Sequence, residues 1–310
     1  MGVSRILVIK LGALGDVVQA LGPMAAIRAH HRAARIVLLT TKPYADFLKS
    51  CPFVDEVWID TKPSLWNPVG LLALRQRLRQ GGFARVYDLQ TSDRSSWYFR
   101  LMGRPRPHWS GIAPGCSHPH ANPRRDFLHT LERQAEQLAM AGIDRPVPLP
   151  DLAWVTADIA RFGLPPAYAL LAPGGAPHRP AKRWPADRFA ALAEALRGRG
   201  IAPVLIGTQA DEESLAAIRQ AVPAAIDLSG KTSFADLAVL ARGARLAVGN
   251  DTGPMHLAAA AGAASLVLFS NESDPSLCTP RAERVRILRR PDLADLALDE
   301  VLAEIDRLVG

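Results

Sequence analysis

The sequence predicts an α/β protein with two tandem domains, each built on a parallel β-sheet. At 310 residues the chain is about twice the length of a typical domain. Short apolar runs alternate with segments of helical period along the chain, which is typical of a parallel sheet. Five prolines at positions 146, 148, 150, 165 and 166 interrupt this alternation. Since proline disfavours continuous regular structure, we expect the boundary there and domains at 1–150 and 151–310.

The first half of the chain opens directly with an apolar run of strand length, Ile6 to Ile9. Glycines and polar clusters then separate the later runs, as expected for turns. We regard residues 111–123 as irregular, because they are rich in Gly, Pro and His. The expected strands are 5–11, 35–40, 54–59 and 85–89; the expected helices are about 15–31, 67–80, 93–102 and 126–141, with a further short element at 43–50.

The second half repeats the same alternation. The expected strands are 169–172, 202–206, 225–228, 246–249 and 265–269, and the expected helices are 186–199, 212–221, 234–242 and 253–261. A last amphipathic helix, 293–308, closes the chain, and we leave open whether it packs back on the N-terminal domain. Both halves are Rossmann-like, so ligands should bind at the carboxyl ends of the strands, with the two sheets facing each other across a cleft.

The composition excludes several classes of protein. With 48% apolar and 22% charged residues, the chain is unlike disordered sequences. Its apolar runs fall short of the roughly 18 residues that a membrane-spanning helix needs. No cleavage site follows the first apolar run, so we expect a cytoplasmic protein. The cysteines, Cys51, Cys116 and Cys278, are odd in number and far apart, which predicts neither a disulfide framework nor a zinc site.

The positive charge is concentrated in the first half of the chain. Residues 1–150 hold 20 Lys and Arg against 11 Asp and Glu, whereas residues 151–310 hold 17 against 19. Such an imbalance indicates an anionic partner, which is a nucleic acid, a membrane surface or an acidic substrate. We find no recognised nucleic-acid-binding motif.

The first strand runs into a glycine-containing turn, Lys10-Leu11-Gly12-Ala13-Leu14-Gly15-Asp16, that opens a helix. The G-x-x-G spacing differs from the G-x-G-x-x-G of dinucleotide binding, which argues against NAD. Asp16 has two interpretations. It caps the helix and favours its dipole, or it is a carboxylate that removes a proton from a hydroxyl as a general base.

The second domain carries a comparable stretch after its first strand. Gly174 and Gly175 precede Lys182-Arg183-Trp184-Pro185, in which Pro185 suits a helix start. A lysine beside a glycine pair and a helix N-terminus can bind a diphosphate. Solvated loop charges remain the alternative.

A third stretch follows the strand 246–249 and reads Asn250-Asp251-Thr252-Gly253-Pro254-Met255-His256. Asp251 and Thr252 suit an N-cap, and Gly253 permits a ligand to approach the backbone. Capping does not explain a histidine in an otherwise apolar, Ala-rich helix. His256 is therefore a ligand-binding residue or a satisfied core histidine.

Together these three stretches resemble the signature of glycosyltransferase family 9, the lipopolysaccharide heptosyltransferases. Their order and separation fit the family, and the segment Arg124-Arg125-Asp126-x-x-His129-x-x-x-Arg133 is also similar to it. The resemblance implies the GT-B fold and an inverting, metal-independent transfer of heptose from ADP-heptose to an inner-core lipopolysaccharide acceptor. No D-x-D triplet occurs, in agreement with an enzyme that uses no metal and no separate cofactor.

The resemblance also implies roles for single residues. Asp16 is similar to the catalytic base and Lys182 to the lysine that stabilises the leaving diphosphate. The donor-binding residues would be Gly174, Gly175, Lys182, Asp211, Thr232, Asp251, Thr252, Gly253 and His256, with Asp211 near the ribose and Thr232 near the base. The acceptor-binding residues would be Lys10, Gly15, Arg94, Arg124 and Arg125, and we expect no metal ligand.

The acceptor and the basic first half together suggest peripheral association with the anionic inner face of the cytoplasmic membrane. One departure from the family bears on the donor. Ser270-Asn271-Glu272-Ser273-Asp274-Pro275 stands where relatives often have a Gly-Pro-Thr-Asp-Pro-like loop. A different nucleotide sugar for another surface glycan therefore stays open, as does a non-catalytic nucleotide-sugar-binding module. A metal site at Cys116, His118 and His120 is an alternative to an acceptor loop there.

Overall fold

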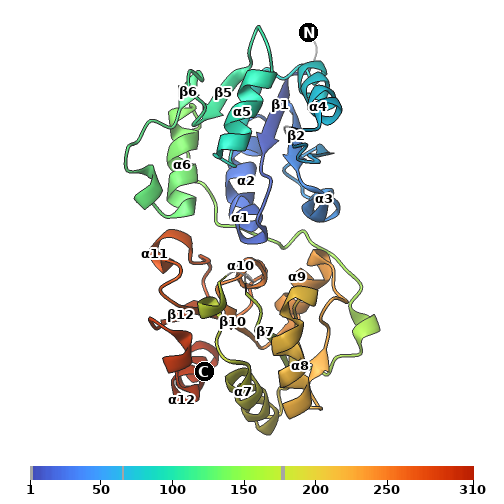
Figure 1. Cartoon of the computed structure of the whole chain (residues 1–310), viewed down its shortest axis with the longest axis vertical. Helices are drawn as coiled ribbons and strands as arrows, with labels where there is room; N and C mark the ends of the chain where they lie inside the picture. Colours follow the sequence, from blue (N-terminus) through green and yellow to red (C-terminus); the bar gives the residue numbers. More distant parts are fainter. Residues whose placement is uncertain (1–2, 65, 176–178) are drawn as a thin grey trace. The chain divides into compact units, whose positions relative to one another are not determined.

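The computed structural model describes residues 3–64, 66–175 and 179–310, and it divides the chain into two compact units, residues 1–150 and 151–310 (Figure 1). Each unit is a parallel sheet with helices packed on it. We describe them in turn as the N-terminal and C-terminal domains. Within the described residues, no helix is long and apolar enough to cross a membrane.

The N-terminal domain has a sheet in the order β3-β2-β1-β4-β5-β6, and every pairing is parallel. Its strands are β1 (Arg5–Ile9), β2 (Arg35–Thr40), β3 (Glu56–Ile59), β4 (Arg85–Asp88), β5 (His108–Gly111) and β6 (His118–Pro119). Its helices are α1 (Leu14–Gln19), α2 (Leu21–His30), α3 (Lys42–Leu48), α4 (Pro68–Gln80), α5 (Asp93–Leu101), η1 (Arg125–Phe127) and α6 (Thr130–Met140).

The C-terminal domain has a sheet in the order β12-β11-β10-β7-β8-β9, again parallel throughout. Its strands are β7 (Tyr168–Ala172), β8 (Ala202–Leu205), β9 (Ile226–Asp227), β10 (Leu246–Asn250), β11 (Ser265–Phe269) and β12 (Val285–Arg289). Its helices are η2 (Ala160–Phe162), η3 (Pro180–Lys182), α7 (Ala186–Gly198), η4 (Gln209–Asp211), α8 (Glu212–Ala221), α9 (Phe234–Gly243), α10 (Gly253–Ala260), α11 (Pro275–Cys278), η5 (Leu293–Asp295) and α12 (Leu298–Val309).

The two sheets share one topology. In each, the first strand lies beside the fourth, so the strand order reverses between β1 and β4 and between β7 and β10. The loops that leave these neighbouring strands diverge to opposite faces of the sheet, which opens a crevice where ligands bind in such folds. The topology therefore directs attention to the loops after β1, β4, β7 and β10.

The central strands are buried on both faces, which explains their continuous apolar runs. Every residue of β7, β10 and β11 is buried. Large aromatic side chains complete the packing, with Trp184 against Phe189 in the C-terminal domain and Phe99 against Trp109 in the N-terminal domain.

Several expected elements differ from the structure. The expected helix 15–31 is two helices, α1 and α2, that meet at Ala20, and Gly22-Pro23 follows directly. The segment 111–123, which we expected to be irregular, begins at the end of β5 and contains the short edge strand β6. Strand β12 was not expected, because its charged sequence VRILR lacks the apolar character of the other strands. The expected helix 126–141 begins with the turn η1, and α6 starts only at Thr130.

The final helix is used within its own domain. It packs against α7, β11 and β12, and Val301 and Ile305 belong to the core of the C-terminal domain. The apolar face that was considered for packing on the N-terminal domain is thus buried against the C-terminal sheet.

Gly249 lies in β10 where no side chain fits. A Cβ atom there would lie 2.7 Å from the Cβ of Ala172 and 2.8 Å from the sulfur of Met255. We predict that Gly249→Ala lowers the free energy of unfolding of the C-terminal domain by about 1–3 kcal/mol through overpacking. Gly198→Ala, at a helix end with open space around it, should not destabilise the domain. Urea unfolding of both variants tests this; equal stability would show that β10 and β7 shift apart freely.

Candidate active site

The loop after β1 lies at the reversal point of the N-terminal sheet and is held from both neighbouring strands. The backbone N–H of Lys10 donates to the carbonyl of Leu39 at the end of β2 (3.0 Å). The next N–H, of Leu11, donates to Oε1 of Gln90 in the loop after β4 (2.8 Å). These bonds fix the start of the turn that carries Gly12, Gly15 and Asp16.

Lys10 is a buried cation beneath this turn. Its Nζ donates to the carbonyl of Leu89 (3.2 Å) and lies 3.8 Å from Oδ1 of Asp16. Burial lowers the pKa of Lys10, and the negative charges of Asp16 and Asp88 partly offset this effect. The charge of buried Lys10 is therefore favoured by the two carboxyl groups beside it.

Asp16 is in the first turn of α1, and its side chain is 46% exposed. Its Oδ2 accepts the backbone N–H of Ala13 (3.2 Å), which is the capping contact considered from the sequence. The other oxygen faces Lys10. The structure thus supports the capping interpretation and still leaves a solvent-accessible carboxylate at the sheet edge, as a general base requires.

Asp88, at the end of β4, is a buried carboxyl group next to this loop. Its Oδ1 accepts the N–H groups of Gln90 and Thr91 (3.1 and 3.0 Å), whereas Oδ2 has no hydrogen-bond partner among the described residues. Burial raises the pKa of Asp88 to about 6 and outweighs the hydrogen bonds that favour its charged form. Its position at the end of an apolar strand was the signal by which the sequence could have revealed it.

The predicted acceptor residues are placed differently from one another. Gly15 lies in α1 beside Asp16. Arg94, in the first turn of α5, directs its guanidinium to the hydroxyl of Tyr98 (3.2 Å) and the carbonyl of Pro63 (3.5 Å). Arg124 is exposed just before η1. Within the part of the chain that the structure describes, no hydrogen bond or ion pair joins these three residues into one cluster.

Arg125 is part of a polar network with residues of the segment 111–123. Its Nε donates to Nδ1 of His120 (3.3 Å), so the other ring nitrogen of His120 donates to Glu136 (2.7 Å). Cys116 points elsewhere, with its thiol toward the carbonyl of Gly111 (3.7 Å). Among residues 3–64, 66–175 and 179–310, no three His, Cys, Asp or Glu side chains gather as metal ligands would.

In the C-terminal domain, Asn250 ties together the loops at the reversal point. This wholly buried amide accepts the backbone N–H of Trp184 (3.0 Å) and donates to the carbonyls of Pro173 (2.8 Å) and Gly174 (3.0 Å). Every hydrogen-bonding group of the amide is used in joining the end of β10 to the loop after β7 and to the start of α7. The residue after it, Asp251, is thereby fixed.

Asp251 is the centre of a charged cluster. Its Oδ2 accepts from Nζ of Lys182 (2.6 Å) and from the hydroxyl of Ser273 (2.7 Å), and Oδ1 lies 3.8 Å from Nε2 of His256. Burial opposes the charge, but the contacts with His256, Lys182 and Ser273 outweigh it and hold the pKa of Asp251 far below its usual range. Asp251 therefore stays ionised beside Lys182.

Asp211 is also buried, but its oxygens serve the backbone. Oδ1 accepts the N–H of Gly175 (3.2 Å), and Oδ2 accepts the N–H (3.0 Å) and hydroxyl (2.9 Å) of Thr208. A Cβ atom on Gly174 would lie 2.4 Å from this carboxylate, which explains glycine there. Asp211 thus joins the loop after β8 to that after β7.

The remaining predicted donor-binding residues make fewer contacts with the Asp251 cluster. Thr252 is the N-cap of α10, but its hydroxyl donates to the carbonyl of Asn250 (3.1 Å) and leaves the helix N–H groups without a side-chain cap. Gly253 opens the helix. Thr232 is partly exposed between β9 and α9, at the far edge of the sheet from Asp251.

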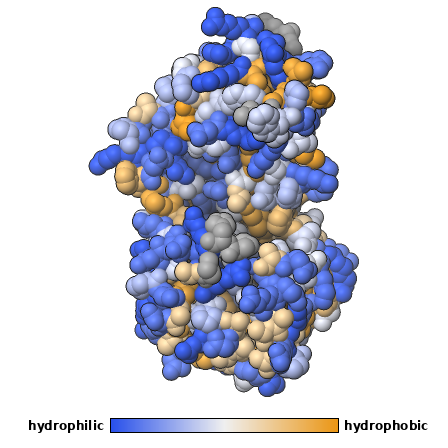
Figure 2. All heavy atoms as spheres, in the orientation of Figure 1, coloured by the Kyte–Doolittle hydropathy of each residue, from blue (hydrophilic) through white to orange (hydrophobic). Residues whose placement is uncertain are grey.

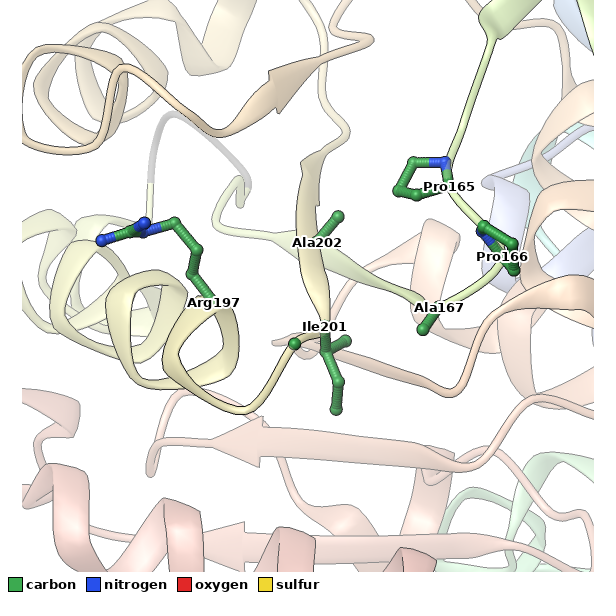
Figure 3. Close-up of a pocket in the computed structure, with 7 residues that line it drawn as sticks. Pro165, Pro166, Ala167, Arg197, Ile201 and Ala202 are labelled. Carbon is green, nitrogen blue, oxygen red and sulfur yellow. The ribbon is translucent and has the colours of Figure 1, made fainter.

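A surface pocket of about 510 Å³ lies elsewhere in this domain (Figure 3). It is formed by the segment before β7, the end of α7 and the start of β8, and Figure 3 shows Arg197 on one side, Pro165 and Pro166 on the other and Ile201 between them. This is the amino edge of the sheet, opposite the Asp251 cluster. The lining is mainly apolar and holds no paired charges comparable to those at the reversal point.

Sequence reasoning missed three positioning residues. Gln90 and Asp88 were not singled out, although both follow a strand end, and Ser273 was considered only as part of a departure from the family pattern. In the structure, Ser273 donates directly to Asp251. The strand end gave a signal for Asp88, but the contacts of Gln90 with Leu11 and of Ser273 with Asp251 join segments far apart in sequence and leave no local signal.

Two parallel sheets of one strand order, each with charged loops at its reversal point, define a protein of two Rossmann-like domains. The structure of E. coli ADP-heptose lps heptosyltransferase II shares this GT-B fold, with a TM-score of 0.83 over 98% of both chains and 23% sequence identity.

The family model for glycosyltransferase family 9 (heptosyltransferase) matches residues 71–298. The chain therefore belongs to glycosyltransferase family 9.

Curated relatives agree with this assignment. The chain is 37% identical to lipooligosaccharide heptosyltransferase 2 of Haemophilus influenzae over 120 residues, which cover 37% of the chain and 34% of that protein. It is 26% identical to lipopolysaccharide heptosyltransferase 1 of Pseudomonas aeruginosa over 290 residues, which cover 86% of the chain and 78% of that protein. The first of these matches thus spans about a third of the relative's length.

The buried carboxyl group of Asp88 makes stability depend on pH. Since its pKa is about 6 in the fold and about 3.9 in an unfolded chain, the folded protein binds the extra proton between these values. The free energy of unfolding should therefore fall as pH rises from about 4 to 6, by up to about 3 kcal/mol from this group.

Asp88→Asn should remove that slope. His31, whose pKa burial lowers to about 4, gives an opposite slope in both proteins, and it cancels in the difference between them. Urea unfolding from pH 4 to 7.5 measures this difference. If the free energy of unfolding changed with pH in the same way in both proteins, the raised pKa of Asp88 would be contradicted.

Proposed function

We propose that this protein is a glycosyltransferase that moves a heptose from ADP-heptose to an inner-core lipopolysaccharide acceptor, with inversion at the anomeric carbon and without a metal ion or separate cofactor. Membership of family 9 supports the reaction class. The names of the relatives support the sugar and the glycolipid, and the name of the E. coli structural neighbour supports the donor.

The observation that carries the proposal is the 2.6 Å contact between Lys182 and Asp251 at the reversal point of the C-terminal sheet. Lys182 reaches this position from η3, just before α7, and its side chain is only partly exposed. A cation preorganised there can stabilise the charge that develops on a departing diphosphate. Asp251 keeps that cation in place and, with His256, offers acceptors and donors for sugar hydroxyls.

Glycines and helix starts would complete the donor site. The N–H groups at the start of α10, which no side chain caps, suit phosphate oxygens. Gly174, Gly175 and Gly253 permit close approach of the backbone. We assign Asp211 to the ribose side through the loops it joins, and Thr232 to the side of the base.

Asp16 would act as the general base. Its carboxylate takes the proton of the acceptor hydroxyl, while that oxygen forms a bond to the anomeric carbon. The bond from this carbon to the diphosphate oxygen breaks on the opposite face, and the electron pair leaves with ADP. Lys10, 3.8 Å from Asp16, would offer a positive charge to the acceptor beside the base.

The acceptor would bind to the basic N-terminal domain. Inner-core glycolipids carry carboxylate and phosphate groups, and the excess of 20 basic over 11 acidic residues in 1–150 complements them. Lys10, Gly15, Arg94, Arg124 and Arg125 are the proposed contacts. Such an acceptor would place the enzyme on the cytoplasmic face of the inner membrane.

The donor alternative rests on the segment Ser270–Pro275. Ser273 within it contacts Asp251, so a departure from the family sequence lies directly beside the proposed sugar site. A different nucleotide sugar, used for another surface glycan, would be selected here. The roles of Lys182 and Asp16 would be the same for that donor.

Replacing Asp16 by Asn tests the catalytic role. The amide oxygen can still accept the N–H of Ala13, so the fold should be preserved while basicity is lost. We predict that kcat for transfer falls by about 10²- to 10⁴-fold while the affinity for donor is unchanged. Transfer of labelled heptose to delipidated acceptor, with calorimetric donor binding, measures both quantities.

The matched control is Asp46→Asn, an exposed carboxylate of the same domain that pairs with Lys49. This variant should transfer at the normal rate. Full activity of Asp16→Asn would remove Asp16 from the mechanism, and absence of transfer by the unaltered protein would favour the non-catalytic module.

A further inference from the structure

Helix α4 and the turn before it expose large apolar side chains to solvent. Trp66 is 95% exposed, Val69 76% and Leu72 60%. Val69 and Leu72, three residues apart in α4, lie on one face of the helix, and Trp66 lies in the turn just before it. Leu74 and Leu78, on the other face, are buried in the domain core. We call Trp66, Val69 and Leu72 the α4 surface. Figure 2 shows apolar surface where α4 lies in Figure 1, bordered by hydrophilic surface.

The polypeptide that presents this surface is anchored. Asn67 caps α4 by accepting the N–H of Gly70 (2.9 Å). Pro63 is buried against the same turn, and a Cβ on Gly70 would lie 3.0 Å from it. The guanidinium of Arg94 approaches the Pro63 carbonyl from α5 (3.5 Å). Trp66 is thus exposed beside a first helical turn that is capped and packed.

The surroundings of the α4 surface are basic. Residues 61–87 contain Lys62, Arg75, Arg77, Arg79 and Arg85 and no Asp or Glu. Lys62, Arg75, Arg77 and Arg79 are all exposed, and the guanidinium of Arg77 also lies 4.4 Å from the ring centre of Trp58. Apolar side chains surrounded by cations suit the interfacial layer of an anionic lipid bilayer, where tryptophan is also favoured.

The α4 surface begins at the same edge of the sheet as the candidate base. The segment before α4 follows the carboxyl end of β3, and the loop that carries Asp16 follows the carboxyl end of β1 in the same parallel sheet. Arg94 bonds to this segment from the first turn of α5, and Gln90, just before α5, holds Leu11. Both segments are therefore anchored to the connection between β4 and α5.

We propose that the α4 surface docks the N-terminal domain on an anionic phospholipid membrane, with Trp66, Val69 and Leu72 entering the interfacial layer and the neighbouring cations contacting lipid phosphates. A second copy of this chain is a poorer occupant, since apposing two such surfaces would bring like charges together. The inference deepens the proposed function by naming the surface through which the enzyme reaches a glycolipid, but the vesicle assay below needs neither donor nor transfer.

The test is flotation of the full-length protein with vesicles of phosphatidylethanolamine and phosphatidylglycerol, compared with vesicles of phosphatidylcholine alone. We expect binding to the anionic vesicles, weakened by salt, and a Trp66→Ser/Val69→Ser variant should bind them about tenfold or more weakly. Tryptophan emission should shift to the blue on binding, and Trp66→Phe should bind but lose most of the shift.

Ile287→Ser is the matched control, because Ile287 is an exposed apolar residue of the C-terminal domain. It should bind vesicles as the unaltered protein does. The double variant should also transfer heptose to delipidated acceptor at the normal rate, which separates docking from catalysis. Equal vesicle binding by the double variant, or concentration-dependent dimerisation that the double variant abolishes, would overturn the proposal.

Discussion

The candidate donor site depends on one buried amide. Asn250 uses its oxygen for the N–H of Trp184 and its nitrogen for the carbonyls of Pro173 and Gly174, so three loops meet at one side chain. A buried amide left unpaired costs far more than a bonded one gains, so these loops form together or not at all. Asp251 is the next residue in the chain, so the position in which it pairs with Lys182 is fixed by the hydrogen bonds of Asn250. The positions of the charged side chains at the reversal point thus depend on the buried hydrogen bonds of Asn250.

The two domains share a strand order but differ in their charge. In the C-terminal domain, the opposite charges of Lys182 and Asp251 pair with each other at the reversal point. Together they would suit a ligand that carries both charge and hydroxyl groups. In the N-terminal domain, cations exceed anions, and the exposed Asp16 lies above buried Lys10. In the proposed function, one fold used twice would supply a diphosphate-binding edge and a proton-accepting edge, because function in such folds lies in the loops.

Much of the fold could be predicted from the sequence, because the buried parallel strands read as continuous apolar runs. The exceptions have physical causes. β12 is an edge strand with charged residues, β6 spans only two residues, and helices α1 and α2 divide where Gly22 and Pro23 weaken the helical pattern. In the site, strand-end motifs located Asp16, Lys182 and Asp251. The supporting contacts of Gln90, Ser273 and Asp88 join segments far apart in sequence, and only the folded chain brings them together.

Calorimetric titration of the purified protein with ADP, UDP and GDP, each with and without Mg²⁺, tests most directly the claim that the C-terminal edge holds an adenosine diphosphate sugar. We predict that ADP binds more tightly than UDP or GDP and that Mg²⁺ leaves the affinity for ADP unchanged. A preference for UDP or GDP, an affinity that requires Mg²⁺, or absence of binding would contradict it.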